Sequence, residues 1–197
     1  MKKFFLPLLA VGLWSTPALA ETYVSGSVGL GSLGNADAIS PVGTARGTVE
    51  FKSGVPFGVA AGLKSNEYRA EAAIGYQSNT INKVSGATVT GSDVSSLSLM
   101  LNGYRDFIID GSSLSPYVTA GVGMAKIKAK VSGTTVIDQS GVFAWQLGGG
   151  VGLQASKNIT VDLGYRYFKP SNASYISLPI EVTSSDSQFL VGARYSF

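Results

Sequence analysis

The chain contains neither cysteine nor histidine. Without cysteine it can form no disulfide, bind no metal through thiolates, carry no lipid on an N-terminal cysteine and use no thiol nucleophile. Without histidine it lacks the usual general base of serine hydrolases and a common ligand of zinc and copper. Serine is abundant, but with no histidine to activate it we interpret serine as structural. These absences predict no catalytic residues, no metal site and no cofactor.

Charge is also sparse, because charged residues make up 14% of the chain against about 25% in an average soluble domain. Without Lys2 and Lys3, 13 basic and 12 acidic residues remain, a net charge of +1 that argues against nucleic acid as a partner. Beyond the first twenty residues there is no apolar run of 18, so helices cannot span a membrane. The remaining structure that satisfies every backbone group in lipid is a closed barrel.

The N-terminus has the pattern of an export signal. Residues 1–3 are a short basic segment, residues 4–14 are an apolar run with one proline, and Ala18 and Ala20 form a small-x-small cleavage site before Glu21. The run is much shorter than the ~20 residues of a spanning helix, so a retained anchor is the weaker alternative. We therefore predict a signal peptide at residues 1–20 and a mature domain at 21–197.

Apolar and small or polar residues alternate with a period of two throughout the predicted mature chain, which is typical of strands with one apolar face. The pattern predicts eight strands, at residues 22–31, 46–64, 69–77, 94–107, 115–131, 142–155, 159–168 and 189–197. Residues 126–130 place three lysines on the formerly apolar face. This phase predicts that the fifth strand has left the membrane there or contains a bulge.

The predicted connections alternate in length. Those near residues 32–45, 78–93, 131–141 and 170–186 are long, and those near 65, 110 and 157 are short. Outer-membrane barrels combine long external loops, short internal turns and an even number of strands. A soluble β-sandwich is the alternative, but it explains neither the export signal nor the small and polar face in all eight segments. We predict an all-β, eight-stranded antiparallel up-and-down transmembrane β-barrel.

The C-terminal strand carries a further pattern. Phe189, Val191, Tyr195 and the terminal Phe197 share one face of this strand. The pattern resembles the C-terminal signal that the barrel-assembly machinery reads in bacterial outer-membrane barrels. This resemblance implies that machinery as a partner during biogenesis.

Several motifs together resemble the opacity-type and surface-antigen family of small outer-membrane barrels, which share the architecture of the outer-membrane protein A transmembrane domain. They are residues 23–31 (YVSGSVGLG), 98–104 (SLMLNGY), 116–123 (PYVTAGVG), 148–152 (GGGVG), 163–167 (LGYRY) and 192–197 (GARYSF). The resemblance covers nearly the whole predicted mature chain. It implies the outer membrane of a Gram-negative bacterium, contact with its lipid and lipopolysaccharide, and an adhesion or neighbour-cell ligand at four external loops.

Charged residues on the non-lipid face would meet inside the barrel. They are Lys64, Arg69, Glu71, Asp162, Arg166 and Arg194. An eight-stranded barrel is just wide enough for side chains to fill it, so we expect these charges to pair and plug the lumen. The alternative is a narrow gated pore in which Arg194, Arg166 and Glu71 exchange partners.

Three functions therefore remain open: a surface protein with a structural or adhesive role, a small pore and, more remotely, a lipid-modifying enzyme. Six aromatic residues lie near predicted strand ends, where we expect their rings at the lipid headgroup level: Tyr104, Tyr117, Tyr165, Tyr167, Tyr195 and Phe197.

Overall fold

The computed structural model describes residues 20–34, 36–40, 43–84, 87–88, 90–171, 173–174, 181–183 and 185–197. The predicted signal peptide, including Ala18, lies outside the described residues except for Ala20. Glu21 is the first residue of the first strand. Within the described ranges, no helix has the length and apolar character needed to cross a membrane.

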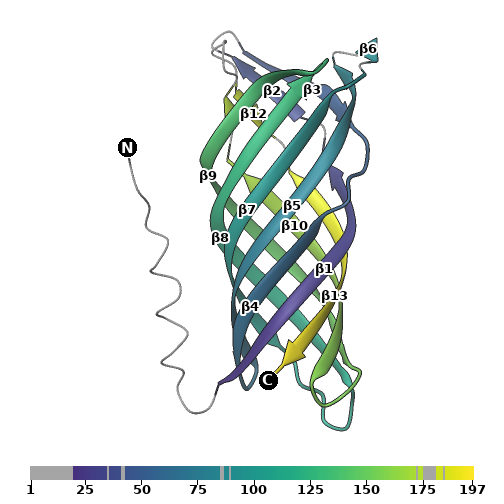
Figure 1. Cartoon of the computed structure of the whole chain (residues 1–197), viewed down its shortest axis with the longest axis vertical. Coiled ribbons are helices and arrows are strands. Elements are labelled where there is room, and N and C mark those ends of the chain that lie inside the picture. Colours follow the sequence, from purple (N-terminus) through teal and green to yellow (C-terminus); the bar gives the residue numbers. More distant parts are fainter. Residues whose placement is uncertain are drawn as a thin grey trace.

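The described elements are strands, and eight of them form a closed antiparallel ring (Figure 1). The ring runs β1, β4, β5, β7, β8, β9, β10 and β13, and β13 returns to pair with β1. The predicted eight-stranded up-and-down barrel is therefore confirmed. The bounds of these ring strands are β1 Glu21–Leu33, β4 Phe57–Ser65, β5 Tyr68–Val84, β7 Asp93–Asp106, β8 Leu114–Val131, β9 Thr134–Gln154, β10 Ile159–Pro170 and β13 Asp186–Ser196.

Five further strands lie at one end of the ring, at the top of Figure 1. Four of them, β2, β3, β11 and β12, extend the outer part of β5 into a small sheet in the order β11-β12-β2-β3-β5, and β6 pairs with β5. We call this the external end. The bounds of these strands are β2 Ala36–Ser40, β3 Gly43–Phe51, β6 Ala87–Thr88, β11 Ala173–Ser174 and β12 Glu181–Thr183.

The short connections lie at the opposite end, together with the start of β1 and the C-terminus (Figure 1). They cover residues 66–67, 107–113 and 155–158. The predicted asymmetry between the two ends is therefore present, although the predicted long loops contain strands.

The two faces of each ring strand differ as the period of two predicts. The outward face is a band of exposed apolar side chains, among them Val59, Leu101, Met124 and Phe189 at 61–66% exposure. The inward face is small, polar or charged near the short-turn end, and more apolar toward the external end. A band of this kind is stable only in an apolar surrounding, as on a transmembrane barrel.

The second predicted strand, 46–64, is not continuous. It divides into β3 and β4, and residues 52–56 between them make irregular contacts. Gly54 forms an isolated bridge with Gly31, and the Pro56 carbonyl accepts a 2.9 Å hydrogen bond from the Gly29 N–H. Proline has no N–H to donate to a ladder, which explains the break at this point.

The predicted loop at residues 131–141 is also wrong. β8 and β9 continue as one long hairpin, and only Ser132 and Gly133 form the turn. Their φ angles are +50° and +79°, the positive values that a tight two-residue hairpin favours because they match the strand twist. The alternation persists inside the hairpin, where Ile127 and Ile137 are buried.

The structure explains why residues 126–130 place three lysines on the face of β8 that is apolar earlier in the strand. β8 alternates without interruption, so Lys126 and Lys128 stay on its outward face, where each lies 3.6 Å from a carboxylate oxygen of Asp138 on β9. Two register shifts lie in β9 instead, opposite residues 125–127 and 129–130, and Gly141, with a φ of +74°, lies in the first of them. The strand β8 therefore extends beyond the apolar band, and the bulges belong to its partner β9.

Candidate functional site in the barrel lumen

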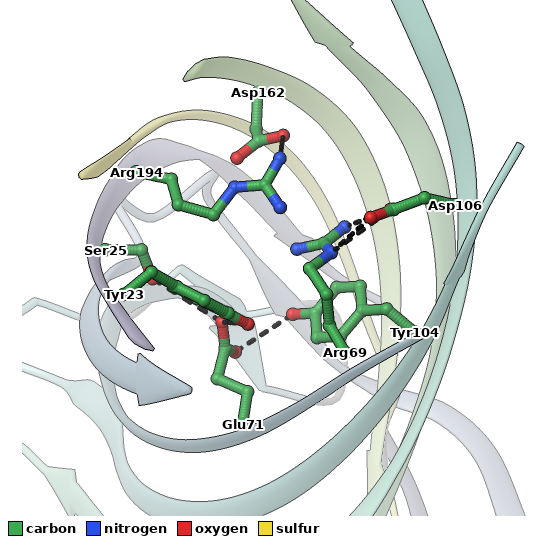
Figure 2. Close-up of polar contacts among 8 residues, drawn as sticks. All are labelled: Tyr23, Ser25, Arg69, Glu71, Tyr104, Asp106, Asp162 and Arg194. Atoms are coloured by element: carbon green, nitrogen blue, oxygen red, sulfur yellow. Dashed lines mark hydrogen bonds and ion pairs between the residues drawn. The ribbon is translucent and has the colours of Figure 1, made fainter. Parts of the chain in front are cut away.

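The most buried ion pair of the lumen joins neighbouring strands β5 and β7. Arg69 donates from Nη2 to Asp106 Oδ1 at 2.8 Å and from Nε to Oδ2 at 2.9 Å (Figure 2). The side chains are 3% and 5% exposed. Two parallel N–H···O bonds fix the guanidinium plane as well as its charge.

Two tyrosine rings lie beside this guanidinium. The Arg69 Cζ lies 4.1 Å from the ring centroid of Tyr104 and 5.1 Å from that of Tyr117. The two rings meet edge to face with centroids 5.8 Å apart. Both tyrosines therefore point into the lumen, and the expectation that they sit at the lipid headgroup level is wrong. Cation–π contact with two rings stabilises a charge that is removed from water.

Glu71 lies at the centre of a second group and is held by neutral donors. Its Oε2 accepts from Tyr23 Oη at 3.1 Å and from Ser25 Oγ at 3.5 Å. Its Oε1 accepts from Tyr104 Oη at 3.0 Å and from Asn102 Nδ2 at 3.1 Å. Among the described residues no cation forms an ion pair with Glu71, so hydrogen bonds alone replace its hydration.

A third group faces the first across the lumen (Figure 2). Arg194 of β13 donates from Nη2 to Asp162 Oδ1 of the neighbouring β10 at 3.1 Å, with side chains 7% and 18% exposed. The Arg194 guanidinium also lies 5.6 Å from the Tyr23 ring centroid. Together the three groups, which we call the lumen layer, connect β1, β5, β7, β8, β10 and β13 through side chains.

Glycines make room for the aromatic members of the lumen layer. A Cβ added to Gly62 would overlap the ring of Tyr23, and one added to Gly164 would press against the Tyr117 hydroxyl. The high glycine content therefore has a local reason: small inward residues on one strand admit large ones from another.

The structure brings together four of the six predicted lumen charges, namely Arg69, Glu71, Asp162 and Arg194. Lys64 lies apart, as the second-last residue of β4 at the short-turn end, with its Cα opposite Glu21. Among the described residues it forms no ion pair. Arg166 lies nearer the external end than Asp162 and lines two cavities. It too forms no ion pair or hydrogen bond with any described residue.

Asp106 is the functional residue that the sequence reasoning missed. It continues the inward alternation of Asn102 and Tyr104 within the predicted strand 94–107. Because every second residue of a strand faces the same side, applying the alternation to residue 106 would have placed its carboxylate in the lumen.

The external half of the lumen has a different chemistry. An apolar cluster fills one side of it with residues from β7, β8, β9 and β10: Met100, Ala125, Ile127, Ala129, Ile137, Val142, Ala144 and Phe168. Opposite it runs a chain of side-chain amides that includes Asn79, Gln77 and Gln188.

Two small cavities lie in the lumen, one within the lumen layer and one in the external half. One of about 80 Å³ lies beside Arg69, Glu71 and Arg194, and one of about 70 Å³ lies toward the external end beside Phe168 and Asp186. Their shared walls include Ser98, Gln146 and Arg166. In the part of the chain that the structure describes, no group of three acidic side chains could hold a metal ion.

The residues of the predicted assembly signal all lie on the outward face of β13 or at its end. Phe189, Val191, Tyr195 and Phe197 are 66%, 52%, 47% and 68% exposed. Phe189 packs on Tyr165 with ring centroids 5.2 Å apart, and Tyr195 packs on Phe197 at the same separation. Their rings thus reach both rims of the apolar band.

Known proteins share this architecture. The family model for the outer membrane protein beta-barrel domain matches residues 6–197. Outer membrane protein PagN of Salmonella typhimurium is 27% identical over 118 residues, which cover 50% of this chain and 48% of PagN. The chain thus matches about half the length of this curated relative.

Two solved structures show the same fold. Neisserial surface protein A has a TM-score of 0.61 at 20% identity, with 89% of this chain and 97% of that chain covered. Outer membrane protein OprG from Pseudomonas aeruginosa has a TM-score of 0.68 at 12% identity, with 90% and 95% covered.

Proposed function

Because this chain belongs to the outer membrane protein beta-barrel domain family, we propose that it is a structural or binding protein whose external end meets its partners while its lumen stays plugged. It lies in the outer membrane of a Gram-negative bacterium. The opacity-type resemblance of its motifs agrees with this family. Four external connections, partly built as strands, are the proposed binding surface.

The lumen layer is the observation that carries the plug. Arg69 and Asp106 pair with each other, Arg194 pairs with Asp162, and four neutral donors surround Glu71. A permeant ion would have to break one of these arrangements, and separating a buried pair costs about 3–5 kcal/mol. In an eight-stranded ring the remaining space is small. The function is then left to the external end and the outward face.

The external end suits binding because strands order it. The β8–β9 hairpin and the small sheet that contains β2, β3 and β12 project beyond the ring (Figure 1). Ordered strands lose little conformational entropy when a partner binds. We infer a ligand on a host or neighbouring cell, with lipid and lipopolysaccharide around the apolar band. The barrel-assembly machinery is the expected partner during biogenesis.

Planar-bilayer conductance tests the plug. Folded protein, verified by a heat-dependent shift in gel migration, is expected to stay silent, and Arg194→Ala is expected to leak. Discrete channels from the unaltered protein would overturn the plug. Binding of whole cells to surfaces or cells, lost after proteolytic shaving of the external end, would support the binding role; binding that survives shaving would contradict it.

A narrow pore is the second candidate, and Arg166 is the observation that favours it. This cation lines both cavities and has no ion pair among the described residues. Its guanidinium would be available to an anion that passes between the two cavities. Channels whose conductance changes in Arg166→Gln but not in Lys64→Gln would favour the pore over the plug.

We propose no catalytic role, and the absence of histidine and cysteine supports this. A lipid-modifying activity would require another base and nucleophile in the lumen or on the outward face. Lipid mass spectra that change with expression of the protein would overturn the proposal.

A further inference from the structure

The amide chain of the external lumen half has a defined direction. The Lys52 carbonyl accepts a 3.0 Å hydrogen bond from Asn79 Nδ2, so the Asn79 Oδ1 must face Gln77. Gln77 donates to that oxygen from Nε2 at 2.7 Å and turns its own Oε1 toward Gln188. Gln188 Nε2 then donates to Gln77 Oε1 at 2.8 Å and also to Asp186 Oδ2. Each amide orientation follows from the one before it.

The direction of the chain leaves acceptors at its end. Gln188 Oε1 and Asp186 Oδ1 are buried and have no hydrogen-bond partner among the described residues. The two residues are only 6% and 4% exposed, so bulk water does not satisfy these oxygens. Flipping the Gln188 amide would not help, because its oxygen would then face two other acceptors. An unsatisfied buried acceptor is costly, and such atoms mark a place where a donor binds.

Both residues line the external cavity of about 70 Å³. Ser96 lines it too, and its buried Oγ is likewise without a partner among the described residues. Phe168 and Ile127 supply apolar walls. At about 10–15 Å³ for each water-sized position, the space corresponds to about five such positions, enough for a small organic molecule.

The cavity lies near the external mouth of the barrel. Asp186 is the first residue of β13, and Pro170, which also lines the cavity, is the last residue of β10. The lumen layer lies on its other side. A solute would therefore enter from outside the cell and stop there.

We propose that this cavity binds a small external solute through its primary ammonium group. The ammonium would donate to Asp186 Oδ1 and Gln188 Oε1, the two unpartnered oxygens that β13 presents to the cavity. The carboxylate of Asp186 selects a cationic donor over a neutral hydroxyl. The short alkyl part would pack against Phe168 and Ile127. Arg166, on the shared wall, would meet a carboxylate if the solute carries one.

Calorimetric titration of the protein, solubilised in detergent from outer membranes, tests this site. The probes are propylammonium, β-alanine, propionate and 1-propanol, which are similar in length. Saturable binding of propylammonium or β-alanine, without binding of the other two, is expected. Preference for β-alanine would assign a role to Arg166, and preference for propylammonium would confine recognition to the ammonium group. No saturable binding by either amine, or equal binding by 1-propanol, would overturn the proposal.

Asp186→Asn is expected to weaken binding at least about tenfold, because it removes the charge from the bond. Asp138→Asn is the matched control, since it changes the net charge equally at an external carboxylate that contacts Lys126 and Lys128. Equal affinity in Asp186→Asn and the unaltered protein would refute the site.

A spectroscopic measurement needs no variant, should Asp186→Asn fail to fold. The side-chain amide resonances of Gln188 should shift upon saturation with the amine that binds, whereas those of Gln154, which is exposed at the short-turn end of β9, should not. Unchanged Gln188 resonances at saturation would place any binding elsewhere. The outcome is independent of whether the external end binds other cells.

Discussion

Arg69 and Asp106 form a two-pronged ion pair in which Nη2 lies 2.8 Å from Oδ1 and Nε lies 2.9 Å from Oδ2, with both side chains at most 5% exposed. Their Cα atoms are not direct partners in the ladder, since Arg69 lies opposite Tyr104. The pair is therefore diagonal across the β5–β7 seam. This diagonal contact gives the lumen layer its most buried charge and leads to the first prediction.

Asp106→Ala should lower the free energy of unfolding by about 3–5 kcal/mol, because it leaves the Arg69 guanidinium buried without its anion. Urea unfolding in lipid vesicles, followed by tryptophan fluorescence, measures the change. Glu67→Gln is the control: its partner Arg105 is 3.7 Å away, and the side chains are 45% and 53% exposed. That substitution should cost less than about 1 kcal/mol. Equal effects of the two substitutions would show that burial of the pair is unimportant.

Glu71→Gln should destabilise the barrel by about 1–3 kcal/mol, although it keeps the shape of the side chain. The new amide group would present N–H bonds to Asn102 Nδ2 or to tyrosine hydroxyls that now donate to the carboxylate. The same urea titration measures it. Lys64→Gln, at a predicted lumen charge without an ion pair among the described residues, should change stability by less than about 0.5 kcal/mol. A large loss of stability in Lys64→Gln would indicate that Lys64 does interact with the other lumen charges.

Gly62→Ala should be harmful because its Cβ would overlap the Tyr23 ring and displace the hydroxyl from Glu71. We expect a loss of about 1–3 kcal/mol, the usual range for overpacking. Gly103→Ala is the matched control, since an added Cβ there has no heavy atom within 4 Å. The temperature at which half of the protein changes from folded to unfolded gel migration should be lower for Gly62→Ala than for Gly103→Ala. Coincident midpoints would contradict the packing seen at Gly62.

Deletion of Phe197 should impair assembly in cells without abolishing the fold. The residue is 68% exposed and its ring packs on that of Tyr195, so deletion removes little buried area and one backbone hydrogen bond, from the Phe197 N–H to the Thr22 carbonyl. We expect less protein in the outer membrane but normal refolding of purified chain in detergent. Ser196→Ala, on the inward face, should leave both unchanged. Equal loss in cells and in detergent would mean that Phe197 acts through stability instead.

The mature protein should begin at Glu21. Intact mass spectrometry of protein from the outer membrane is expected to give the mass of residues 21–197. Ala18→Asp should block cleavage, because the signal peptidase site requires small side chains there. A mass that includes residues 1–20 would show that the segment is retained.

Much of the fold is readable from local patterns. Alternation assigns residues such as Leu99 and Met100 to opposite faces before any partner is known, because successive side chains of a strand must point in opposite directions. Where the prediction was wrong, the patterns were polar on both faces, as in residues 78–93, or the backbone was interrupted, as at Pro56. Polar residues form strands readily when a neighbouring strand pairs with their backbone N–H and carbonyl groups. A local stretch of sequence does not reveal that neighbour.

The sequence by itself assigned Arg69, Glu71, Asp162 and Arg194 to the lumen, because the parity of a strand position assigns its side chain to one face. Only the tertiary structure decided which of them meet. Glu71 binds four neutral donors from β1 and β7, Arg69 reaches diagonally to Asp106, and Arg166 remains beside two cavities. Ring closure and strand register set these distances. The strands that close the ring, β1 and β13, are more than a hundred residues apart in the sequence. A periodic pattern specifies a face and leaves the register across the ring to tertiary packing.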